Sequence, residues 1–110
     1  MTIQMHLGDK VFGLIKNGAK TIEARVNDPK RQTIKIGDTI EFINNQTDER
    51  LRAEIVDLFK FMTFAELFAN QPAEDFGGKD QAELNATIYK YYSKEEETKY
   101  GVVGIKIALK

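Results

Sequence analysis

The chain has 110 residues, 42% of them hydrophobic, including seven Phe and four Tyr. This length and composition predict one domain with a packed core over residues 1–110. The absence of Cys and the single histidine, His6, exclude a disulfide framework, thiolate catalysis, a His-based triad and a Cys-ligated or multi-His metal site. No apolar run is long enough for a membrane span and no signal-peptide pattern is present. We therefore expect a cytoplasmic protein with no membrane partner, no metal and no cofactor.

The net charge is only −1, but it is distributed unevenly along the chain. Residues 1–35 carry seven Lys or Arg against three Asp or Glu, whereas residues 36–110 carry nine against fourteen. A basic first third is suited to a local site for an anionic ligand, although an ordinary mixed surface would give the same balance. The chain lacks the overall basic excess of proteins that coat nucleic acid.

The first residues predict a strand followed by a helix. Ile3, Met5 and Leu7 alternate with polar residues, as in a half-buried strand. A helix is predicted over residues 10–17, and it ends before Gly18 because glycine tolerates the left-handed conformation common at helix ends.

The most informative segment follows that helix end. A second strand is predicted directly after it, and Lys20 lies at the mouth of this strand. The alternation places on one face of the strand Ile22, Ala24 and Val26, and on the other Thr21, Glu23 and Arg25. An ammonium, a hydroxyl, a carboxylate and a guanidinium therefore gather at a helix-to-strand turn, a common location for functional groups. A salt-bridged solvent face is the alternative interpretation.

Three further cations are candidates for contacts with an anionic ligand. Lys16 lies near the end of the predicted helix, and Lys30 and Arg31 lie in a polar loop over residues 27–33. We expect them to flank the site and meet phosphates. An ordinary basic loop would look the same.

The middle of the chain predicts a hairpin with one unusually long strand. Residues 44–48 are polar turn formers, and the strand after them extends from Glu49 to about Phe61. Its hydrophobic phase switches at Ile55 and Val56, which predicts a bulge or a sharp bend.

The remaining residues predict helices and a closing strand. Thr63 to Glu66 and Ser93 to Glu96 match the capping-box pattern of a helix start. A helix over residues 81–92 is predicted to bury Leu84, Ile88 and Tyr91, and a strand over residues 103–109 ends the chain. Long bent strands with interspersed helices predict an α+β fold, a mixed β-barrel of about five to six strands.

Three sequence blocks carry a resemblance to a known family. They are residues 18–25 (GAKTIEAR), 36–42 (IGDTIEF) and 100–105 (YGVVGI). In this order and spacing they resemble the ASCH domains, the activating-signal-cointegrator homology group of the PUA-like superfamily. The resemblance runs over nearly the whole chain. It implies a small β-barrel with helices flanking a cleft, and a role in binding RNA or in nucleotide-related chemistry.

One branch of similar small bacterial proteins implies an enzymatic alternative. Those proteins are amidohydrolases that deacetylate acetylated cytidine nucleosides with a lysine, a threonine and a glutamate. Lys20 matches their lysine, but Glu23 occupies the position of their threonine, and no acid is present from Phe76 to Lys79, where their glutamate would fall. We therefore expect weak or no amidohydrolase activity.

Three functions remain open on the sequence. In the first, the chain binds RNA or a modified nucleoside or nucleotide, Lys20 and Arg25 receiving a phosphate or a base edge, Thr21 adding a hydrogen bond and Glu23 accepting from an exocyclic amine. In the second, Lys20 attacks or polarises an amide and Glu23 relays protons as the catalytic pair of a small hydrolase. In the third, Glu23 and Arg25 simply pair within a structural or protein-interaction module.

Overall fold

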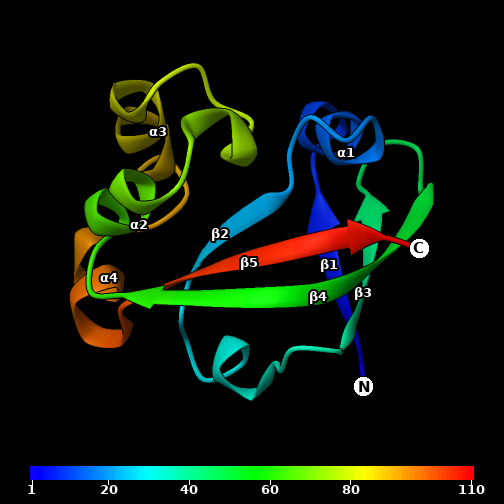
Figure 1. The fold of residues 1–110 in the computed structure, drawn as a ribbon, viewed down its shortest axis with the longest axis horizontal. Coiled ribbons are helices and arrows are strands. Elements are labelled where there is room, and N and C mark those ends of the chain that lie inside the picture. The colour runs from blue at the N-terminus through cyan, green and yellow to red at the C-terminus, as the bar shows by residue number, and fades with distance from the viewer.

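Residues 1–110 are all described by the computed structural model, an α+β fold built on one five-stranded sheet (Figure 1). Its elements in chain order are β1 (Thr2–Leu7), α1 (Asp9–Lys16), β2 (Ile22–Val26), the 3-10 helix η1 (Arg31–Thr33), β3 (Thr39–Asn44), β4 (Arg50–Phe61), α2 (Phe64–Asn70), the 3-10 helix η2 (Ala73–Phe76), α3 (Gln81–Ile88), α4 (Lys94–Tyr100) and β5 (Val102–Leu109).

The sheet follows the order β1-β3-β4-β5-β2, with β1 parallel to β3 and every other pair antiparallel. The predicted α+β fold and strand number are confirmed. The sheet is curled into a half-barrel. It does not close, because β1 and β2 remain its two edges. Figure 1 shows α1 near one end of β2, and η1 near the other end.

The predicted irregularity in β4 is confirmed as a bulge at Val56. Ile55 pairs with Ile107 of β5, whereas Asp57 pairs with Lys106, so Val56 is the extra residue. Val56 is exposed, while Ile55 is fully buried. Because a bulge bends its strand, β4 can pair with β3 through residues 50–54 and with β5 through residues 53–61.

The two faces of the sheet are buried in separate apolar clusters. The first cluster packs α1 against one face of the sheet, which we call the inner face. It includes Phe12, Ile15, Val103 and Ile105. The second joins α2 and η2 to the outer face, and it includes all three apolar residues of β2. The alternation in β2 therefore leaves Glu23 and Arg25 on the inner face, beside their β5 partners Ile105 and Val103.

The helix starts follow the capping predictions, but the third helix is shorter than expected. The Thr63 side chain accepts a hydrogen bond from the Glu66 N–H, and Ser93 forms a full capping box with Glu96. Helix α3 ends at Ile88, so the prediction that the helix continues to residue 92 and buries Tyr91 is wrong: the ring of Tyr91 is exposed. Tyr92 turns inward instead, because its ring stacks on Phe64.

A buried carboxylate fixes the segment that carries Tyr92. Glu97 of α4 accepts hydrogen bonds from the Tyr89 hydroxyl (2.8 and 3.0 Å) and from the Phe64 N–H at the start of α2 (2.8 Å). Burial, followed by these interactions with Glu97, raises the pKa of Tyr89 to about 12. Residues 89–97 are therefore tied to α2 from both ends.

We expect Glu97→Ala to destabilise the protein by about 1–3 kcal/mol for each donor left unpaired, because the Phe64 N–H and the Tyr89 hydroxyl both lose their acceptor. Tyr89→Phe should have a smaller effect, since it removes a donor and leaves the carboxylate bonded to Phe64. Urea unfolding monitored by circular dichroism measures both. Glu95→Ala, on the exposed side of the same helix, is the control, and a Glu97→Ala variant as stable as this control would contradict the prediction.

Candidate functional site

The turn between α1 and β2 fixes the position of Lys20. Gly18 adopts φ +84°, the left-handed conformation that glycine tolerates best. The Ala19 N–H donates to Asn17 Oδ1 at 2.9 Å, and the Lys20 N–H donates to the Leu14 carbonyl at 2.9 Å. The backbone leading to Lys20 is thus held by hydrogen bonds, and the start of β2 is directed along the inner face.

Lys20, Glu23 and Arg25 converge in one cluster, with the carboxylate between the two cations. Lys20 Nζ lies 3.1 Å from Glu23 Oε1, and Arg25 Nη2 lies 3.5 Å from Glu23 Oε2. The side chains are 11%, 7% and 17% exposed, respectively. The ions therefore interact in a largely desolvated environment, where their attraction is stronger than on an open surface.

The protonation of Glu23 reflects these neighbours. Burial alone raises the pKa of Glu23, but the charges of Lys20 and Arg25, with hydrogen bonds from Lys20 and the Ala24 N–H, outweigh it. The net pKa of Glu23 lies below its ordinary value. The carboxylate is therefore ionised at neutral pH and acts as an acceptor.

Two side chains from other elements extend the cluster. Arg31 of η1 lies near Arg25, and burial together with this neighbouring charge lowers the pKa of Arg31 from its ordinary value. Tyr92 reaches the cluster from the segment before α4. Burial lowers the pKa of Arg25, but the Glu23 carboxylate and the Tyr92 hydroxyl outweigh it, so the net pKa of Arg25 is raised.

Two buried polar atoms of this cluster have no hydrogen-bond partner, Glu23 Oε2 and Arg31 Nη1. The 3.5 Å separation between Arg25 Nη2 and Glu23 Oε2 is longer than a good N–H···O bond, so this ion pair leaves the oxygen unsatisfied. Buried polar atoms are seldom left unpaired. The arrangement thus leaves one carboxylate acceptor and one guanidinium donor unpaired in the buried part of the cluster.

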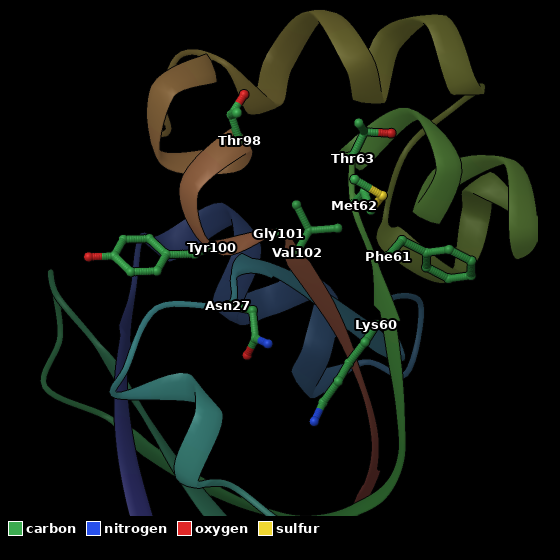
Figure 2. A pocket seen from close by; sticks show the side chains of 9 residues that line it. All are labelled: Asn27, Lys60, Phe61, Met62, Thr63, Thr98, Tyr100, Gly101 and Val102. Carbon is green, nitrogen blue, oxygen red and sulfur yellow. The ribbon is translucent and has the colours of Figure 1, made fainter.

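A separate pocket of about 490 Å³ opens at the other end of β2, where β4 and β5 meet α2 and α4 (Figure 2). Its wall is formed by Asn27, Lys60, Phe61, Met62, Thr63, Thr98, Tyr100, Gly101 and Val102. Figure 2 shows the polar ends of Asn27 and Lys60 on one side of the pocket, opposite Thr63 and Thr98. The Lys20–Glu23–Arg25 cluster does not line this pocket.

With this geometry in place, comparison with known proteins identifies the family. The family model of the ASCH domain matches residues 5–110. The chain belongs to the ASCH domain family. Hypothetical protein PH0355, known from a crystal structure, is 33% identical and matches with a TM-score of 0.89 over 100% of both chains. Protein PF0455 from Pyrococcus furiosus, solved by NMR, is 32% identical with a TM-score of 0.79, over 99% of this chain and 97% of its own.

A more distant match agrees on the fold alone. The ASCH domain from Lactobacillus crispatus JV V101 is 15% identical, with a TM-score of 0.66, over 98% of this chain and 79% of its own. No curated protein sequence matches the chain. None of the helices has the length and apolar content to cross a membrane, and no group of three or more His, Cys, Asp or Glu side chains is arranged to hold a metal ion.

The other residues predicted for the site of this ASCH domain are placed differently. Thr21 is half-buried at the entrance to β2, where its N–H donates to the Asp75 carbonyl. Lys16 is not brought to the cluster, because its ammonium pairs with Glu49 at 2.6 Å. Lys30 is exposed just before η1 and forms no ion pair. Of the three flanking cations, only Arg31 therefore joins the cluster.

Sequence reasoning missed Tyr92 as a member of the cluster. It also missed the separate pocket lined by Asn27 and Lys60. The aromatic run before α4 predicts buried core, and Tyr92 does stack on Phe64 while its hydroxyl approaches Arg25. The one available signal was the position of Asn27, two residues beyond Arg25 in the alternation of β2. Lys60 carried no such signal, because its position depends on the pairing of β4 with β5.

Proposed function

We propose that this ASCH domain binds RNA or a nucleotide derivative at the Lys20–Glu23–Arg25 cluster. The observation that carries the proposal is the pair of unsatisfied buried atoms, an acceptor on Glu23 and a donor on Arg31. A nucleotide supplies a complement to both, because its base carries N–H groups and its phosphate carries acceptor oxygens. Membership of the ASCH family gives independent support.

Each side chain then has a defined task. Glu23 Oε2 accepts from an exocyclic amine, as of cytosine or adenine. Arg25 and Arg31 offer planar guanidinium groups suited to bidentate contact with phosphate. Three cations, Lys20, Arg25 and Arg31, face two carboxylates, Glu23 and Asp28, so the local charge favours an anion.

A purely structural role is the competing explanation, and the tight ion pairing of Glu23 favours it. A cluster that only stabilised the half-barrel would satisfy its own buried groups, since each unpaired one costs stability. Glu23 Oε2 and Arg31 Nη1 are not satisfied. We therefore place ligand binding first and the structural or protein-interaction role second.

The test measures, by calorimetry, the binding of cytidine, adenosine, uridine and short single-stranded RNA. The measurements are repeated at several salt concentrations. We expect binding to weaken with salt, and Arg31→Ala to flatten the slope by roughly 0.7 log units per log unit of salt for the phosphate contact it removes. Lys30→Ala should flatten it by a similar amount, because its exposed ammonium is expected to meet a further phosphate.

Lys16→Ala is the matched control, because its charge is already compensated by Glu49. The control should bind as the wild type does. Affinity that does not change between low and high salt, or no binding to any of these RNAs and nucleosides, would contradict the proposal.

The hydrolase alternative has one observation in its favour. The segment after η2 lies against Lys20: a Cβ placed on Gly77 would lie 3.4 Å from Lys20 Cδ. This is the stretch, residues 76–79, in which the glutamate of the similar amidohydrolases would fall. The stretch carries no acid here, so Lys20 has Glu23 as its carboxylate partner.

A further inference from the structure

The strand register connects the cluster to the pocket. Arg25 of β2 pairs with Val103 of β5, and Val103 pairs with Lys60 of β4. Directly paired residues in an antiparallel sheet point to the same face. Arg25, Val103 and Lys60 therefore form one row across the inner face, with the two cations on either side of a buried valine.

The pocket continues this row toward the end of the sheet. Asn27 follows β2 on the same side as Glu23 and Arg25, and its N–H donates to the Gly101 carbonyl at 3.0 Å. Strands lie about 4.8 Å apart, so the backbones at Arg25 and Lys60, two strands apart, are separated by roughly 10 Å. The side chains of both residues are long enough to contact neighbouring groups of one extended ligand.

The pocket has the chemistry of an anion site with an apolar wall. Lys60 forms no ion pair, and none of the nine lining residues is acidic. Asn27 also lines the pocket. Its Oδ1 is a buried acceptor, so a phosphate is met by its amide NH2 group, which donates. Phe61, Met62 and Val102 supply apolar surface. A volume of about 490 Å³ lies within the range of sites for small organic ligands.

We propose that this pocket is a second nucleotide subsite, which holds the nucleotide adjacent to the one bound by Glu23. Lys60 and the Asn27 carboxamide bind its phosphate, and the base packs on the apolar wall beside Tyr100. The subsite rests on the proposed function, because the first nucleotide is the one assigned to the cluster. The smallest ligand that uses the whole site is a dinucleotide.

The experiment compares cytidine 5′-monophosphate with the dinucleotide CpC, using calorimetry on the full chain. Wild type should bind CpC more tightly than the mononucleotide. Lys60→Ala should weaken CpC binding about tenfold and reduce its salt slope by roughly one, while leaving the affinity for the mononucleotide unchanged. Asn27→Asp, which places a carboxylate of nearly the same size in the pocket, should also remove the gain from the second nucleotide.

One control variant and two distinct outcomes separate the possible failures. Lys10→Ala removes an exposed lysine of α1 that lies outside the pocket, and it should bind both ligands as the wild type does. If CpC keeps its advantage in both Lys60→Ala and Asn27→Asp, the second subsite is wrong while the proposed function stands. If neither ligand binds to the wild type, both proposals are overturned.

Discussion

Replacing Glu23 with alanine is expected to cost about 3–5 kcal/mol of stability, the usual effect of removing one partner from a buried ion pair. Glu23 is buried between Lys20 and Arg25, so the substitution leaves two desolvated cations without their shared counterion. Their mutual repulsion adds to the cost. Urea unfolding at neutral pH measures the change directly.

The same carboxylate should make the fold sensitive to acid. The pKa of Glu23 is lowered in the folded protein from an ordinary value of 4.5. A lowered folded pKa means that the stabilisation is fully present above about pH 4.5 and is lost as the pH falls toward the folded value. Glu23→Gln should therefore show a flatter loss of stability below pH 4.5 than the wild type.

The exposed pair Lys16–Glu49 provides the comparison. Its side chains are 55% and 43% exposed, so Glu49→Ala should cost no more than about 1 kcal/mol, as is typical of surface ion pairs. A stability loss in Glu23→Ala as small as in Glu49→Ala would mean that the cluster is not the desolvated ion pair described above.

Local sequence patterns were sufficient to predict much of the fold. Alternation places Glu23 and Arg25 on the face opposite Ile22, because successive side chains of a strand point to opposite faces. The phase switch at Val56 marks the bulge, because one extra residue interrupts this alternation. The capping residues Thr63 and Ser93 mark helix starts for an equally local reason, since their side chains bond to N–H groups three residues away.

The parts of the site that the sequence did not predict depend on tertiary packing. Tyr91 and Tyr92 are chemically equivalent neighbours. The early end of α3 and the anchoring of the following segment by Glu97 let Tyr92 turn toward Phe64, while Tyr91 remains exposed. Lys60 lies on the inner face, in the same row as Arg25, because of the register shift at the bulge. Without that shift, residues beyond Val56 would pair one position away and Lys60 would point to the outer face.

The second prediction with a large expected effect concerns catalysis. We expect the wild type to be nearly inactive in the hydrolysis of acetylated cytidine. Its turnover of acetylated cytidine should be at least tenfold slower than that of Glu23→Thr, which restores the threonine of the similar amidohydrolases. Attack on an amide creates an oxyanion, and catalysis requires donors aimed at that charge. In this chain a carboxylate lies 3.1 Å from Lys20, the candidate nucleophile or polarising group.

The magnitude follows from the charges. Two like charges about 4 Å apart repel by roughly 4 kcal/mol at an effective dielectric constant of 20. Even if Arg25 offset two-thirds of this repulsion, about 1.4 kcal/mol would remain, which slows a reaction tenfold.

The assay compares the wild type, Glu23→Thr and Lys20→Ala by following release of acetate from N4-acetylcytidine. Because Glu23→Thr removes the counterion of two buried cations, its folding is checked by circular dichroism, and all variants are assayed at a temperature at which each is folded. Rapid turnover by the wild type that is abolished in Lys20→Ala would overturn this prediction. The carboxylate would then be a working partner of Lys20, and the hydrolase would become the better account of the cluster.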